Sequence, residues 1–245
     1  MRIRHCCLPL LWFLVGIGLA AALGCGFGAW LQSDSGTRAV SRWLSAQLQP
    51  SAPGTRVTLT RLKIRGSQVE IDRALWSGPD EGGIAFLSGI RLSARPARSP
   101  AWLSWRVRAR VEQLDLAALD RVAAKGQWRA AGGLTGPVEL AGAGRRLDGV
   151  NLNLHSGAGG GDLDGRLLSN LIGMMPAGGT REALLKALAA KATFHFREGE
   201  VGLNTEEERY VLHLRLDGDH LLEITLRVPK EGMELLRPLL LGDQR

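Results

Sequence analysis

Side chains alternate between apolar and polar over two successive segments near the carboxyl end, and this pattern limits the fold more than any other feature. One face carries Tyr210, Leu212, Leu214 and Leu216 and continues through Leu222, Ile224, Leu226 and Val228; we call these eight residues the apolar hairpin face. A period of two on either side of Asp217-Gly218-Asp219 predicts a β-hairpin with one apolar and one solvated face. Because the apolar face must be buried, we expect a second sheet, helices or a ligand to cover it.

Shorter alternating segments occupy most of the chain before this hairpin. They predict strands at 56–65, 68–72, 84–87, 90–94, 105–111, 134–140 and 150–155, and a glycine-rich loop at 157–161. In the first strand, Leu62 and Ile64 lie on the face opposite to Val57 and Leu59, which favours one β-bulge. Glycine supplies 32 of the 245 residues, roughly twice the usual share of about 7%, which favours short strands and tight turns. We expect an antiparallel sheet of consecutive strands, about 12–14 in number.

Three segments have helical spacing instead. Apolar residues three and four apart predict an amphipathic helix over 35–48, with Val40, Trp43, Leu44 and Leu48 on one face. Residues 162–175 and 180–191 are expected to form a helical hairpin, whose second helix buries Leu184, Leu185 and Leu188. The predicted fold is mostly β with a helical insertion, α+β overall. Residues 32–54 would form the amphipathic helix and a linker, and 55–245 a β-rich domain with the helical hairpin at about 162–191.

The amino-terminal segment is long and apolar. Residues 6–31 include no charged side chain, and as a helix they would measure about 39 Å against a hydrocarbon core of about 30 Å. Arg2 and Arg4 precede this run, so the positive-inside rule predicts a cytoplasmic amino terminus and an exported carboxyl-terminal domain. We therefore expect residues 1–31 to form a cytoplasmic end and a single transmembrane helix. Arg2, Arg4, Trp12 and Trp30 would anchor it at the membrane interfaces.

A second interpretation of this segment stays open. Ala22-Leu23-Gly24-Cys25 loosely matches a lipoprotein cleavage site, and cleavage there would place a lipid anchor on Cys25 in place of a membrane span. The other two cysteines, Cys6 and Cys7, lie in the same segment, so the exported part has none. Its stability must come from packing and backbone pairing without a disulfide.

The sequence carries no recognisable catalytic or metal-binding motif. It has neither a Gly-x-Ser-x-Gly nucleophile elbow nor a His-Glu-x-x-His zinc motif. Asp162-Leu163-Asp164-Gly165 begins like a calcium loop but lacks the later ligands, so we interpret it as a turn entering a helix. His155, His195, His213 and His220 have no metal-ligand spacing, and one tyrosine with dispersed arginines offers nucleic-acid bases no stacking platform. We expect a non-enzymatic protein with no cofactor, no metal and no nucleic-acid partner.

Four stretches of the chain resemble the AsmA-like group of bacterial envelope proteins. They are the anchor Leu8–Leu31, the helix Arg38–Leu48 leading into Val57–Ile64, the segment Val111–Leu119, and Gly132–Gly142. The chain also looks like the type II secretion protein N, which is closer in length. The resemblance implies a sheet curved into a trough with an apolar lining, anchored in the bacterial inner membrane with its carboxyl-terminal domain in the periplasm.

Two functional hypotheses follow. In the first, the resemblance implies lipid transport or outer-membrane biogenesis, and the apolar hairpin face would line a groove that contacts phospholipid. In the second, the chain is an assembly or interaction module of a protein-secretion or other envelope machine. The same face would then be an ordinary core against residues 162–191, and exposed strand edges would pair with other envelope proteins.

Overall fold

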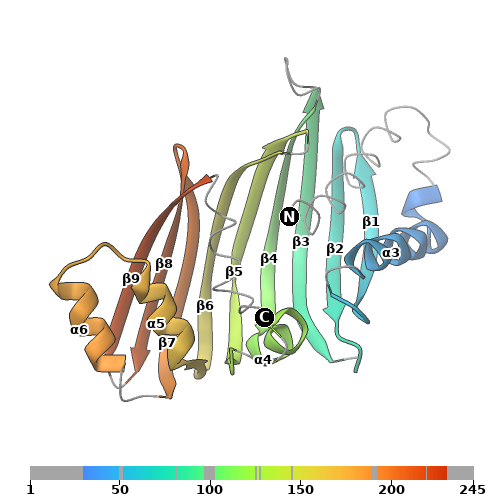
Figure 1. Cartoon of the computed structure of the whole chain (residues 1–245). Helices are drawn as coiled ribbons and strands as arrows, with labels where there is room; N and C mark the ends of the chain where they lie inside the picture. Colours follow the sequence, from blue (N-terminus) through green and yellow to red (C-terminus); the bar gives the residue numbers. More distant parts are fainter. Residues whose placement is uncertain are drawn as a thin grey trace. The chain divides into compact units, whose positions relative to one another are not determined.

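In the computed structural model, nine strands form one antiparallel sheet in which each strand lies beside its neighbours in sequence (Figure 1). The structure describes residues 30–49, 52–80, 82–96, 103–124, 126, 128–144, 146–188, 192–218 and 220–230. The prediction of a mostly β fold with a few helices is confirmed. No helix within these ranges is both long and apolar enough to cross a membrane. The predicted anchor residues Arg2, Arg4 and Trp12, and Cys25, lie outside the described residues, and Trp30 is the first residue described.

The elements follow one another in a simple order. The strands are β1 (Arg56–Arg65), β2 (Gln68–Ser77), β3 (Gly83–Pro96), β4 (Leu103–Asp115), β5 (Ala131–Ala143), β6 (Arg146–Asp164), β7 (Thr193–Glu206), β8 (Arg209–Gly218) and β9 (Leu221–Pro229). The helices are α3 (Asp34–Leu48), α4 (Leu116–Leu119), the π-helix η1 (Asp120–Ala124), α5 (Gly165–Gly173) and α6 (Gly179–Leu188).

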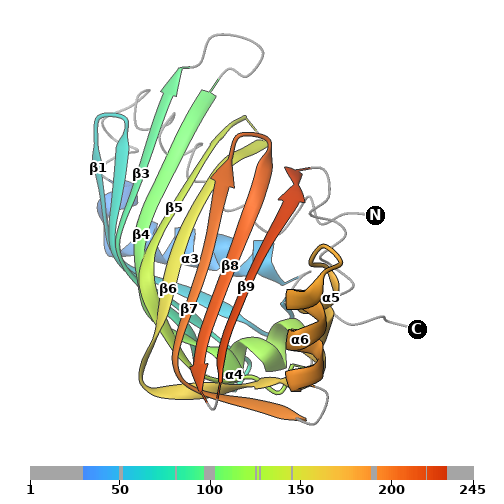
Figure 2. The same ribbon diagram turned by 90° about the vertical axis from the view of Figure 1, so that its left-hand side faces the viewer.

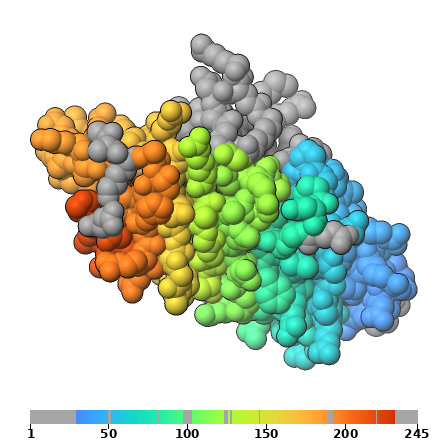
Figure 3. Space-filling view, turned by 90° about the horizontal axis from the view of Figure 1, so that it is seen from below, coloured from blue at the N-terminus to red at the C-terminus, as the bar shows by residue number. Residues whose placement is uncertain are grey.

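The chain divides into two compact units. Unit 1 comprises Met1–Gln113 and Pro137–Val150, and unit 2 comprises Leu114–Gly136 and Asn151–Arg245. Within unit 1, the colours in Figure 3 pass from blue to green over residues 30–96, as expected for strands connected to their neighbours. Each unit has its own cluster of buried apolar side chains, so each packs around a core of its own.

Unit 1 packs α3 against its strands. Ser33 caps the helix, because its hydroxyl accepts a hydrogen bond from the Gly36 amide at 3.2 Å. The predicted amphipathic helix is confirmed: Val40 and Leu44 are buried, and Trp43 and Leu48 pack against the same core. The strands contribute Leu62, Val69, Ile71, Leu92 and Trp105 to this core.

The change of face in β1 does not come from a bulge. Pairing with β2 keeps one register from Leu59 opposite Ala74 to Leu62 opposite Ile71, so the predicted extra residue is absent and that prediction is wrong. Instead Arg61 has a φ of 53°, and this left-handed backbone conformation moves the buried position from Leu59 to Leu62.

A left-handed backbone conformation within β3 also explains why this strand is longer than predicted. The two strands predicted at 84–87 and 90–94 are one strand, Gly83–Pro96, which continues through Gly89 at a φ of 57°. Glycine adopts this conformation without steric cost, so the strand changes face without ending. Sequence patterns that stop at a glycine therefore divide this strand wrongly.

In unit 2, α5 and α6 pack against the part of the apolar face of β8 and β9 that includes Leu214, Leu216 and Leu222 to Leu226 (Figure 2). Both predicted helices are present. The first begins at Gly165 rather than at residue 162, because residues up to Asp164 still belong to β6 and Asp164 caps the helix through the Arg166 amide at 2.6 Å. Leu188 of α6 is buried, and Leu184 and Leu185 pack against the same core.

The glycine-rich segment 157–161 is part of β6 and not the predicted loop. His155 lies opposite Glu200 and Gly161 opposite Phe196, so residues 156–160 bulge against residues 197–199 of β7. Gly160 has a φ of 60°, and a β-carbon there would lie 1.9 Å from the Phe196 carbonyl oxygen, so the close approach of the two backbones requires glycine. Such merged strands explain why the described residues contain nine strands and not about 12–14.

Candidate functional site

The apolar hairpin face lies in the core of unit 2. Seven of its eight residues are buried and Leu212 is partly buried. Leu214, Leu216, Leu222, Ile224 and Leu226 form one cluster with Leu168, Leu171 and Ile172 of α5 and Leu188 of α6. We expected a second sheet, helices or a ligand to cover this face, and in this cluster the cover consists of helices.

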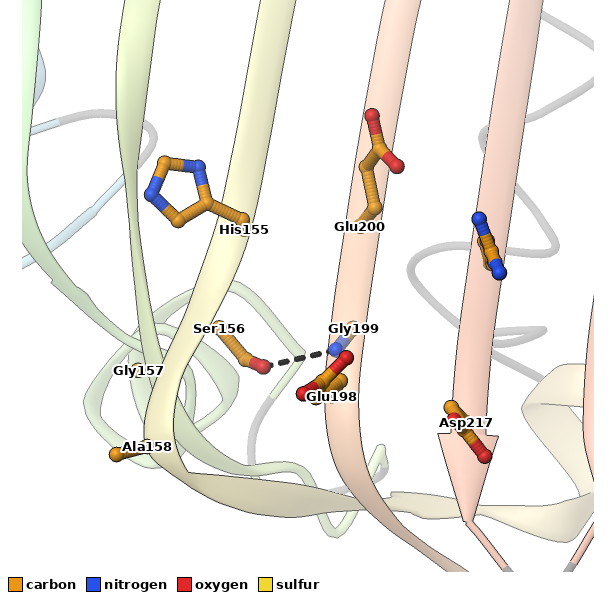
Figure 4. A pocket seen from close by; sticks show the side chains of 9 residues that line it. His155, Ser156, Gly157, Ala158, Glu198, Gly199, Glu200 and Asp217 are labelled. Carbon is orange, nitrogen blue, oxygen red and sulfur yellow. Dashed lines mark hydrogen bonds between the residues drawn. The ribbon is translucent and has the colours of Figure 1, made fainter.

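The opposite, polar face of unit 2 carries a pocket of about 470 Å³ that the sequence did not indicate. It lies over the bulge, where β6, β7 and β8 run side by side (Figure 4). Its lining residues are His155, Ser156, Gly157, Ala158, Glu198, Gly199, Glu200, Arg215 and Asp217. The Ser156 hydroxyl accepts a hydrogen bond from the Gly199 amide at 2.8 Å, which replaces a backbone bond that the bulge interrupts.

The chemistry of this pocket is that of an acidic, solvated surface. Glu198, Glu200 and Asp217 supply three carboxylates, and Arg215 contacts Glu223 at 3.6 Å. These charged side chains are substantially exposed, so their ion pairs contribute little to stability. Within the described part of the chain, no group of three or more His, Cys, Asp or Glu residues is arranged to hold a metal ion. The pocket therefore presents charged side chains to solvent on the polar face of the sheet.

Two of the histidines named in the sequence analysis, and the buried Asp120, bond to neighbouring strands or loops. Asp162 contacts His195 across the β6–β7 pair. His213 Nδ1 lies 3.0 Å from the Thr225 hydroxyl oxygen across β8 and β9. The buried Asp120 carboxylate accepts hydrogen bonds from the Trp128 and Ala130 amides at 3.0 and 3.3 Å, so it fixes the connection into β5.

The first outer strand of the sheet, β1, is closed by side chains of α3, which packs along it (Figure 1). The Ser41 hydroxyl accepts a hydrogen bond from the Leu59 amide at 3.0 Å, and the Ser45 hydroxyl accepts one from the Val57 amide at 2.8 Å. Both hydroxyls also donate to carbonyl groups four residues earlier in the helix. Backbone donors that would otherwise be available to another strand are therefore occupied.

The last strand, β9, has no comparable closure. It pairs with β8 in one unbroken register, from Leu221 opposite Asp217 to Pro229 opposite Arg209. Among the described residues, no second strand pairs with β9 and no side chain bonds its outer backbone groups in the way that Ser41 and Ser45 bond β1. Its side chains alternate strictly between exposed and buried. A straight edge of this kind is a template for pairing with another extended chain.

The strands of the two units also differ in charge. Those of unit 1 carry eleven arginines and lysines and five acidic residues, whereas those of unit 2 carry four arginines and eight acidic residues. The acidic pocket and the edge of β9, which pairs with no second described strand, thus belong to the same negatively charged unit. The sequence alone did not indicate this division, because it depends on which segments pack together.

Comparison with known proteins adds no family to this description. No family model, no curated protein and no solved structure matches the chain at a significant level.

Proposed function

We propose that the chain is a non-enzymatic, membrane-anchored protein of the bacterial envelope that binds an extended segment of another envelope protein along the free edge of β9. The supporting observation is the contrast between a β1 edge whose amides at Val57 and Leu59 are bonded by serines and a β9 edge without such partners among the described residues. Strand addition satisfies such an edge through backbone hydrogen bonds, and side chains on alternate positions select the partner.

The partner segment is expected to be basic. The strands of unit 2 carry twice as many acidic as basic side chains, and three of these acidic residues, Glu198, Glu200 and Asp217, line the pocket beside β8. Charge complementarity of this kind directs association and disfavours partners of the wrong sign. An extended segment that alternates apolar residues with lysine or arginine matches both the edge and its charge.

Lipid transport through an apolar groove is the weaker proposal. That role needs the apolar hairpin face to contact lipid, whereas α5 and α6 pack on Leu216, Leu222 and Ile224 and leave them at most 3% exposed. The inner-membrane anchor, the periplasmic location and a curved sheet remain proposals that rest on residues 1–31 and on the AsmA-like resemblance. These proposals state where docking would take place, and they do not bear on how β9 binds its partner.

Photo-crosslinking in the intact cell tests the docking role. A photoreactive residue replaces Thr225 in β9 of the full chain, and a matched variant carries it at Thr60 in β1; both threonines are exposed and lie within outer strands. We expect a discrete crosslink to a different protein from position 225 and none from position 60. Equal crosslinking from both positions, no crosslink from position 225, or a crosslink from 225 to a second copy alone would contradict the proposal.

A further inference from the structure

A second pocket, of about 770 Å³, lies between α3 and β1 in unit 1. The residues of α3 that line it are Ser35, Arg38, Ser41, Arg42 and Ser45, and the C-cap residue Gln49 also lines it. Ser35, Arg38, Arg42 and Ser45 are three or four residues apart, so they form one stripe along the helix. Arg56 and Thr58 of β1 line the opposite wall. Val40 and Leu44 point into the core, so the pocket faces the polar side of an amphipathic helix.

This pocket concentrates positive charge without a carboxylate. Among the described residues, its lining contains Arg38, Arg42 and Arg56 and no aspartate or glutamate. Arg38 and Arg42 are four residues apart on one helix face, where like charges destabilise a helix. Neither lies in the last turn, where the helix dipole favours a cation. Both side chains are exposed, so solvent screens this repulsion, and a bound anion would reduce it further.

The guanidinium groups are available to a ligand. Arg38 uses its Nε to bond the Asp34 carbonyl oxygen at 3.2 Å, which leaves its two terminal nitrogens. The side chains of Arg42 and Arg56 make no hydrogen bond or ion pair with any described residue. Of the nine other described arginines of unit 1, seven lie within 4.0 Å of a carboxylate: Arg61, Arg65, Arg91, Arg106, Arg108, Arg110 and Arg146. Arg73 and Arg95 have no carboxylate partner among the described residues, so three of the five such arginines in unit 1 line this pocket.

We infer that the α3–β1 pocket binds a phosphate group, with Arg38, Arg42 and Arg56 as its ligands. A planar guanidinium offers two parallel N–H donors to phosphate oxygens, and three of them from two elements surround such a group better than lysines would. The Ser35 and Thr58 hydroxyls line the same pocket and add neutral donors. This site lies in unit 1 and does not depend on β9 of unit 2.

The phosphate has two sources that share this chemistry: free inorganic phosphate and the headgroup of an anionic phospholipid. α3 begins at Asp34, three residues after the apolar segment that ends at Leu31. If that segment spans the bilayer as predicted, the pocket opens within reach of lipid headgroups, where basic side chains are attracted to the membrane surface.

The test uses the full chain in dodecyl maltoside micelles, whose headgroups lack phosphate. Sodium phosphate or phosphatidylglycerol is titrated in, at constant ionic strength set by sodium chloride, and the arginine Nε–H signals are followed by NMR. The test variant is R42Q/R56Q. The control variant K63Q/R95Q removes the same charge from two exposed strand residues of unit 1 that do not line the pocket.

We expect a saturable shift of the Arg38 signal in the native chain and in K63Q/R95Q, and affinity about tenfold weaker or lost in R42Q/R56Q. Saturation by sodium phosphate alone would identify free phosphate as a sufficient ligand, and saturation by phosphatidylglycerol alone would identify the lipid headgroup. No saturable shift with either titrant, or equal affinity in native chain and R42Q/R56Q, would overturn the inference.

Discussion

The two outer strands of the sheet differ in whether a helix of the same unit hydrogen-bonds their outer backbone groups. In unit 1, α3 both buries Val40 and Leu44 and bonds the outer amides of β1 through Ser41 and Ser45. In unit 2, α5 and α6 bury the apolar face of β8 and β9, but no equivalent side-chain bonds reach the edge of β9 among the described residues.

This contrast separates two requirements of a sheet protein. Covering an apolar face stabilises the fold, and either helix arrangement achieves it. Bonding the outer backbone groups of an edge strand prevents unwanted pairing with another chain. It needs hydrogen-bonding side chains that lie opposite those backbone groups. Unit 1 meets the second requirement with two serines, whereas β9 of unit 2 lacks such bonds among the described residues, and this contrast supports the proposed docking role.

The largest effect is expected from emptying the core of one unit. Ile224→Ala removes a fully buried side chain beneath α5, and we expect a loss of about 4 kcal/mol in the free energy of unfolding. Hydrogen exchange should report lost protection mainly in unit 2, whereas Leu62→Ala should act mainly on unit 1. If either variant lowered protection equally throughout both units, the division into two cores would be wrong.

The glycine bulge of unit 2 gives the next largest effect. In Gly160→Ala the new β-carbon would overlap the Phe196 carbonyl oxygen at a backbone φ of 60°, and we expect a loss of about 3 kcal/mol. Gly159→Ala is the matched control, because nothing lies within 4 Å of its β-carbon position. Chemical denaturation of both variants measures the difference, and equal stability would contradict the close backbone approach.

The serine closure of β1 should be worth less. Ser45→Ala leaves the Val57 amide without its 2.8 Å acceptor, and we expect a loss of about 2 kcal/mol together with faster exchange of that amide. Ser35→Ala, at an exposed position of the same helix, should change the stability little. If both variants behaved alike in denaturation, the hydroxyl would not be closing the edge.

The smallest effect concerns the charged surface of unit 1. Glu139 accepts contacts from Arg106 at 3.1 Å and from Arg108 at 3.0 Å, and all three side chains are partly or largely exposed. Glu139→Gln should cost about 1 kcal/mol or less at low ionic strength, and less still in high salt. A loss that persists unchanged in high salt would show that Glu139 acts through packing.

Strict alternation and helical spacing predicted the parts of the fold whose pattern is local. The β8–β9 hairpin and α3 lie where the sequence placed them, because each face is marked by its own side chains. Glycines mark no face, so β3 was divided at Gly89 and the bulged part of β6 was expected to be a loop. Conformations at Arg61 and Gly160 depend on neighbouring strands and are not encoded by the spacing of nearby residues.

The candidate sites were less predictable than the fold. The apolar hairpin face was found because eight residues share one period, but whether helices or lipid covered it depended on contacts with α5 and α6. The pocket at Glu198 and the pocket at Arg42 each combine separate elements. No spacing within one segment connects Arg56 with Arg42, so such sites emerge only when the elements pack.

Amide hydrogen exchange of the two outer strands in the free full chain tests the central contrast most directly. The account predicts slow exchange at Val57 and Leu59, whose amides are bonded by Ser45 and Ser41, and fast exchange at every second amide of β9. Uniform protection along β9, or exchange at Val57 and Leu59 as fast as at the β9 edge, would contradict it.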